Sequence, residues 1–217
     1  MFLTFDRTNF PLLAIEEIGV EIHLLPITKQ QFEQFLAESG ALEPARYQEM
    51  LALHPIPPLD EADPSQRERL FVSGILPAEA QAFARWLGEG FDLPTVKEWR
   101  AVYAALKRTS LPRRDLTAEL SGTPAGPILA NLTRHTLSHL MLDVALLRGG
   151  LVEWVKQGRA FVGLGAPRPD FHPNLWDPLN HEIKPLRPQE RLRYFGFRLI
   201  RRGEWYLADK ENVRYIE

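Results

Sequence analysis

Eighteen prolines and fourteen glycines are spread along the 217 residues, and they set the ends of most elements that the sequence predicts. Proline lacks the backbone donor and restricts the residue before it, while glycine commonly ends a helix. The chain contains no internal repeat and no low-complexity tract. The pattern therefore predicts short helices and strands, in a chain long enough for one large domain or two small ones.

Capping signals mark the starts of three helices. Thr28 and Gln31 have the spacing of a capping box, in which each side chain bonds the other residue's backbone amide, and Thr95 and Glu98 repeat it. Pro77 stands where a first helical residue is favoured. Aromatic and aliphatic residues follow each signal at helical spacing. We expect helices over 28–38, 77–87 and 95–106.

Strand-like alternation occurs near both ends of the chain. We expect one or two strands within 2–25, short strands over 151–155 and 161–164, a late strand over 193–200, and a further strand at 204–207. Residues 131–147 have helical spacing. We expect 41–70, with a short helix near 44–53, and 108–130 to be excursions over the surface, because both are rich in proline or charge.

Five segments match a known pattern in the same order: Pro26–Leu36, Phe71–Leu87, Leu93–Trp99, Gly149–Val155 and Gly196–Arg201. In these segments the chain resembles the formylglycine-generating enzyme family, also called the sulfatase-modifying-factor domain, a variant of the C-type lectin fold. The resemblance spans about residues 20–201. It implies an irregular α+β fold with two or three main helices and short antiparallel sheets. We expect a single such domain over residues 1–217.

The resemblance also indicates which chemistry is missing. In the catalytic members of the family, two cysteines in the late loop region bind copper and oxidise a sulfatase cysteine with oxygen. This chain has no cysteine, so the soft thiolate site that Cu(I) requires cannot form. We therefore exclude formylglycine generation and expect a pseudoenzyme.

A calcium site of the family is also incomplete here. The family's asparagine ligand corresponds to Gly150, which has no side-chain oxygen, although Glu153 and Trp154 remain. Ca²⁺ takes six to eight oxygen ligands, so one carboxylate makes a poor cage. We expect Glu153 to form a structural salt bridge or hydrogen bond, and calcium near Glu153 is the alternative.

Histidines provide a second metal hypothesis. His135, His139 and Asp143 share one face of the predicted 131–147 helix, a spacing that could hold iron or zinc. The chain would then be a metal-dependent oxidase or oxygenase with His and carboxylate ligands in place of the cysteines; His172 with Asp170 is another such pair. We favour a polar helix face for the same residues, because two histidines at this spacing lack a third ligand in any known motif.

The favoured hypothesis is a noncatalytic recognition module that binds a protein partner. The late loop joins aromatic, histidine and charged residues among prolines, and such loops in this fold form variable binding surfaces. The expected partner-binding residues are Arg168, Asp170, Phe171, His172, Trp176 and His181. The resemblance implies bacterial signalling, protease-associated or defence systems as the setting.

Charge and hydropathy exclude two other kinds of partner. The formal net charge of −2 provides no general attraction for nucleic acid. The most apolar stretch, 137–155, is interrupted by charged and polar residues and is too polar to span a membrane. Because residues 1–7 do not resemble a signal peptide, we expect a cytoplasmic protein.

Overall fold

The computed structural model describes residues 2–41, 43–45, 48, 71–108, 116, 118–134, 151–166, 182–184, 191–192, 194–203 and 214–215. Most of the predicted 44–53 helix, the 135–147 part of the predicted 131–147 helix and the predicted strand at 204–207 lie outside this range. Within it, none of the helices is both long and apolar enough to cross a membrane.

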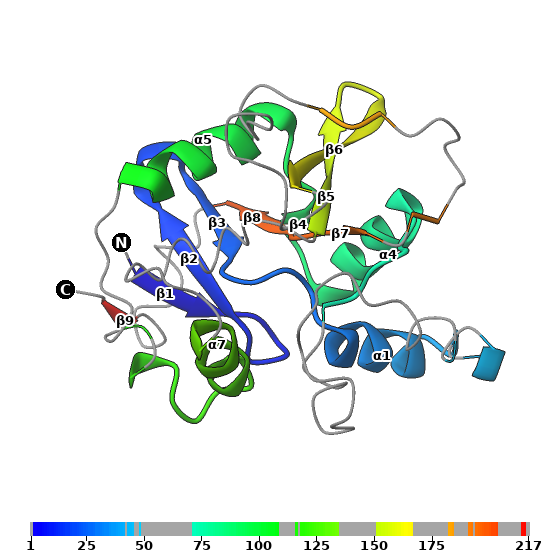
Figure 1. Ribbon diagram of the computed structural model, residues 1–217, viewed down its shortest axis with the longest axis horizontal. Coiled ribbons are helices and arrows are strands. Elements are labelled where there is room, and N and C mark those ends of the chain that lie inside the picture. The colour runs from blue at the N-terminus through cyan, green and yellow to red at the C-terminus, as the bar shows by residue number, and fades with distance from the viewer. Residues whose placement is uncertain are drawn as a thin grey trace.

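A six-stranded antiparallel sheet forms one half of the molecule (Figure 1). Its strand order is β4-β8-β3-β2-β1-β9. The strands are β1 (Phe2–Phe5), β2 (Pro11–Ile15), β3 (Val20–His23), β4 (Phe91–Asp92), β8 (Ile200–Arg202) and β9 (Arg214–Tyr215). Segments far apart in sequence therefore lie side by side, because β8 is inserted between β4 and β3.

The first 25 residues form three strands, where the sequence predicted one or two. A turn between β1 and β2 and the 3-10 helix η1 (Glu16–Ile18) separate them. Gly19 ends η1 with a φ of 65°, a left-handed conformation that glycine adopts without a steric penalty. Strands β1 and β2 are almost wholly buried and pair with the rest of the large sheet. The sheet therefore begins before residue 20, where the family resemblance starts.

A second sheet has three strands in the order β6-β5-β7. Strands β5 (Leu151–Gln157) and β6 (Ala160–Ala166) confirm the two predicted strands and pair as an antiparallel hairpin, and β7 (Phe195–Gly196) runs parallel to β5. The single late strand predicted over 193–200 is thus divided: its first part joins this sheet as β7 and its last residue begins β8 in the other. The division lets one short segment connect both sheets.

The three capped helices are confirmed. They are α1 (Lys29–Glu38), α4 (Pro77–Leu87) and α5 (Val96–Arg108). Thr28 and Gln31 form the expected box at α1. At α5 the Thr95 amide donates to Glu98 Oε2 at 2.7 Å, and the Glu98 amide donates to Thr95 Oγ1 at 3.2 Å. The predicted α+β class is therefore confirmed in its helices and its sheets.

The prediction that 108–130 is a surface excursion is wrong for its second half. Helix α7 (Ala125–Arg134) begins there, and Leu116, Leu120 and Leu129 are fully buried. The prolines of this stretch predicted a loop. Pro127 is nevertheless compatible with a helix, because it is the third residue of α7 and lies in the first turn, where backbone amides have no partner within the helix. The segment therefore forms part of the core.

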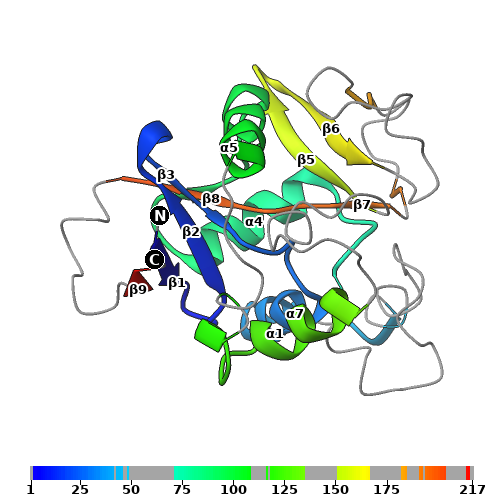
Figure 2. The same cartoon turned by 60° about the vertical axis from the view of Figure 1, so that its left-hand side comes forward.

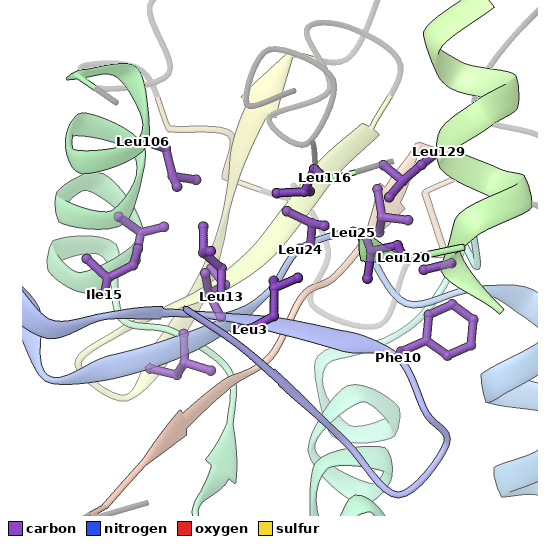
Figure 3. Close-up of a cluster of buried hydrophobic side chains, with 14 of the residues drawn as sticks. Leu3, Phe10, Leu13, Ile15, Leu24, Leu25, Leu106, Leu116, Leu120 and Leu129 are labelled. Carbon is purple, nitrogen blue, oxygen red and sulfur yellow. The ribbon is translucent and has the colours of Figure 1, made fainter. Parts of the chain in front are cut away.

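Helices α5 and α7 cover the same face of the large sheet (Figures 2 and 3). Figure 3 shows Leu106 of α5, Leu129 of α7 and the nearby Leu120 turned toward strand residues such as Leu13. A second apolar cluster joins α1, α4 and the small sheet, and it contains the stacked rings of Phe32 and Phe83. The small sheet thus rests on helices on both sides, since α5 also packs on it through Trp99 and Tyr103.

Candidate functional site

The small sheet carries both ends of the predicted partner-binding loop. The chain leaves β6 at Ala166 and returns to β7 at Phe195, and these two strands flank β5 on opposite sides. Gly163 in β6 leaves space for its neighbours, because a Cβ there would lie 2.3 Å from Val152 and 2.6 Å from the ring of Phe195. The base of the loop is therefore closely packed.

A first anchor holds the loop at residues 182–184. Gly163 and Ile183 exchange two backbone hydrogen bonds of 2.8 Å, so Ile183 pairs with the outer edge of β6. The carboxylate of Glu182 accepts from Arg100 of α5 at 3.1 Å and from Gln157 of β5 at 2.8 Å. These contacts join the loop to two elements of the scaffold at one point.

A second anchor lies just before β7. Arg191 forms a bidentate pair with Glu79 of α4, with distances of 2.6 and 2.8 Å, and donates to the Gly74 carbonyl at 3.0 Å. Glu79 also accepts from the Leu76 amide at 2.8 Å and so caps α4. Bidentate pairs of this kind fix direction as well as distance. The second anchor therefore positions the returning chain against the start of α4.

The end of β6 and the first anchor define where the predicted binding residues are attached, and the second anchor lies further along the chain. Arg168, Asp170, Phe171, His172, Trp176 and His181 all fall between Ala166 and Glu182, and they lie outside the described residues. The alternative ligands His135, His139 and Asp143 also lie outside them. Among the residues that the structure does describe, no three His, Cys, Asp or Glu side chains are grouped closely enough to hold a metal ion.

Below the loop base, three residues from the family-like segments meet in one buried cluster. The Trp99 indole donates to Glu153 Oε2 at 2.9 Å, and Arg198 Nε donates to Glu153 Oε1 at 2.9 Å. Arg198 also donates to the Leu24 carbonyl at 3.1 Å. Its Nη2 lies 2.8 Å from Glu153 Oε1, an ion-pair contact whose angle is poor for a hydrogen bond. Glu153 thus forms the structural salt bridge that the sequence predicted.

This cluster does not suit calcium. Both Glu153 oxygens already accept hydrogen bonds, and a cation bound there would lie beside the guanidinium of Arg198. Like charges repel strongly in a buried site. The residues present at Glu153 therefore do not fit the ion.

Ion pairs also join the two sheets at the surface. Lys156 of β5 and Arg202 of β8 both contact Asp92 of β4, and Arg202 forms a bidentate pair with Glu98 of α5 at 2.8 and 2.7 Å. Burial raises the pKa of Glu98, but hydrogen bonds from Arg202 and Thr95 outweigh burial and lower that pKa to about 2. Glu98 is therefore a carboxylate in the folded protein at any ordinary pH.

No pattern in the sequence identifies the anchoring residues. Arg191 and Glu79 are 112 positions apart, and Arg100 and Glu182 are 82 apart. Glu79 lies two residues after Pro77 and Arg100 directly follows Trp99, and neither position indicates a distant partner. Charged side chains have no periodicity that identifies a distant partner, so only the fold reveals these pairs.

Comparison with known proteins places these features in a family. The model of the sulfatase-modifying factor enzyme 1-like domain matches residues 4–127, which is more than half of the chain and includes the Leu93–Trp99 segment. No curated protein matches the chain. The segments around Glu153 and Arg198 lie beyond the matched range, yet they pair with Trp99 inside it. On these grounds the chain belongs to the sulfatase-modifying factor enzyme 1-like domain family.

Proposed function

We propose that the protein is a noncatalytic recognition module that binds a protein partner through residues 167–181. The observation that carries the proposal is the combination of a family scaffold with a complete absence of cysteine. The family's copper-dependent oxidation needs two thiolates, and among the amino-acid side chains only cysteine forms a thiolate. What this chain retains is the framework that supports a loop.

The attachment of this segment to β6 at one end and to the anchor at Glu182 at the other supports this function. A segment whose ends are held by the scaffold has less freedom to lose when it binds, so more of its contact energy becomes affinity. Four prolines within 167–181 reduce the freedom of the unbound chain further. A segment of this composition on a fixed base is suited to recognition.

The residue types in the segment indicate a protein partner. Phe171, Trp176 and Arg168 are of the types that contribute most of the energy in protein interfaces. The net charge of −2 does not favour a nucleic acid. We place the partner in a bacterial signalling, protease-associated or defence system, the setting that the family resemblance implies, and we expect the module to act in the cytoplasm.

Quantitative capture tests this function. Wild-type protein, F171A/W176A and the control variant I56A/L59A are immobilised and exposed to lysate of the native host, and captured proteins are quantified by mass spectrometry. The control removes two apolar side chains from another proline-rich stretch. We expect at least one protein that wild type and control capture equally and that F171A/W176A captures about tenfold less, as for loss of interface anchors. Binding of that protein is then repeated with purified components.

Two results would oppose the proposal. Equal capture by all three proteins would remove the segment from the interface. Stoichiometric iron, zinc or copper in the purified wild type, lost together with thermal stability in H135A/H139A, would instead support the oxidase or oxygenase hypothesis.

A further inference from the structure

A surface patch of mixed chemistry lies on the small sheet, near the turn that joins β5 to β6. It consists of two apolar residues, Phe161 and Ile183, and two cations, Arg159 and Lys184, and we call it the hairpin patch. The apolar side chains are half-buried and pack on the apolar cluster of α1 and α4, while the two cations are exposed. Ile183 comes two residues after the segment 167–181, so the patch adjoins the proposed interface.

Strand register brings these four residues together. Ile183 pairs with Gly163 of β6 in antiparallel register. Residues opposite each other in such a pair share a face of the sheet, and so do residues two positions apart in one strand. Phe161 therefore lies on the same face as Ile183, at a diagonal position that an aromatic side chain can reach. From Ile183 the chain runs against the direction of β6, so Lys184 lies toward the turn that carries Arg159.

The carboxylates of the neighbouring elements are engaged with other cations. Glu182 pairs with Arg100 of α5, and Asp92 of β4 pairs with cations of β5 and β8. Within the part of the chain that the structure describes, the side chains of Arg159 and Lys184 form no ion pair. Both positive charges are therefore available to a partner, although the chain as a whole has a net charge of −2.

We propose that the protein partner binds the hairpin patch through an acidic segment that carries an apolar side chain. This inference rests on the proposed function, because it describes the partner of the same interface. The apolar side chain of the partner packs on Phe161 and Ile183, and its carboxylates face Arg159 and Lys184. An apolar centre with a charged rim is the usual composition of a protein interface, and opposite charges speed association and orient the partner.

Chemical-shift mapping on the full chain tests the patch with a defined probe. The probe is a synthetic peptide in which four glutamates surround a central phenylalanine, and the control peptide has lysines in place of the glutamates. We expect the glutamate peptide alone to shift the backbone amides of residues 159–163 and 183–184, because only its charge complements the patch. If the glutamate peptide leaves these amides unshifted, the proposal is wrong.

Two variants with the same net charge show whether the position of the cations matters. R159Q/K184Q removes both cations of the patch, and R85Q/K97Q removes two exposed cations from α4 and α5. The affinity for the glutamate peptide should fall about three- to tenfold in R159Q/K184Q, as for the loss of two exposed charge pairs, and change less than about twofold in R85Q/K97Q. Equal losses in both variants would reduce the effect to net charge and overturn the proposal.

Capture from lysate of the native host separates this inference from the proposed function. We follow the protein that wild type captures and F171A/W176A does not. R159Q/K184Q should capture about three- to tenfold less of it at low salt, with a smaller difference at about 0.5 M salt, where exposed charges are screened. Capture of this protein by R159Q/K184Q at the wild-type level would contradict the patch and leave the proposed function standing. Equal capture by F171A/W176A and wild type would contradict the proposed function, whereas the peptide experiment tests the patch independently.

Discussion

The ion pairs formed by the positive residues of 156–203 fall into an interior group and a rim group. Residues 156–203 contain ten Lys and Arg against four Asp and Glu, although the whole chain has a net charge of −2. In the interior, Arg198 pairs with Glu153 at 3% and 4% side-chain exposure. At the rim, Arg191 pairs with Glu79, and their side chains are 29% and 27% exposed.

Because the two groups differ in burial, they contribute differently to stability. An interior carboxylate that loses its partner is left in an apolar environment, so interior pairs decide which segments of the chain can meet. A rim carboxylate that loses its partner can be hydrated, so rim pairs contribute little to stability. The rim pairs are nevertheless the ones that hold the loop base, and they can therefore affect binding more than folding.

The largest expected effect on stability comes from removing one partner of the interior ion pair. Arg198→Met removes the guanidinium and leaves Glu153 buried with only the Trp99 indole as a partner. We expect the free energy of unfolding to fall by about 3–5 kcal/mol, measured by urea denaturation. Glu153→Gln combined with Arg198→Met should recover part of this loss, since no uncompensated charge remains. A loss below about 1 kcal/mol for the single variant would contradict the interior role.

The fold was largely predictable where its signals are local. The capping boxes at Thr28 and Thr95 and the proline at position 77 located three helices, because a cap depends on residues only three positions apart. The start of helix α7 was missed, since Pro124 and Pro127 suggested a loop, whereas its last residues, 131–134, belong to the predicted 131–147 helix. Strand β8 was merged with β7, since periodicity alone cannot tell that a strand changes sheets. The base of the candidate site was not predictable, because its ion pairs join residues about a hundred positions apart.

An intermediate effect is expected at Glu98, which is partly buried and whose pKa is lowered to about 2. Since that pKa is about 2 in the folded protein and 4.5 ordinarily, Glu98 stabilises the fold above about pH 4.5, and this stabilisation is lost as the pH falls toward 2. We expect Glu98→Gln to cost about 1 kcal/mol at pH 7, a value reduced for the exposed part of the pair.

The pH dependence separates the charge of Glu98 from its packing. The difference in unfolding free energy between wild type and Glu98→Gln should shrink as the pH falls from about 5 to about 3. A difference that persists unchanged at about pH 3 would show that the carboxylate charge is not what stabilises the pair.

A smaller effect on stability is expected from the rim anchor. Arg191→Gln removes the bidentate pair with Glu79, and we expect it to lower the free energy of unfolding by about 1 kcal/mol or less. If the anchor positions the proposed interface, the same variant should reduce capture of the partner severalfold. If capture is unchanged, Arg191 has only a structural role. That result would leave the proposal of an interface at residues 167–181 standing.

The smallest effect is expected on the outer surface. Arg7 and Glu38 form an ion pair whose side chains are 47% and 40% exposed. Glu38→Gln should leave both the urea midpoint and partner capture unchanged, and it provides the matched control for Arg191→Gln. A clear shift of the midpoint would remove the distinction between exposed and buried pairs.

Site-specific photocrosslinking tests the central claim most directly, because it reports which residues lie at an interface. A photoreactive phenylalanine analogue is placed at Trp176 in one variant and at Ile56 in another, and each is irradiated in lysate of the native host. We predict a discrete crosslinked protein from position 176 that is missing from position 56 and is competed by unlabelled wild type. No competed adduct from position 176 would contradict the claim that this segment is a recognition surface.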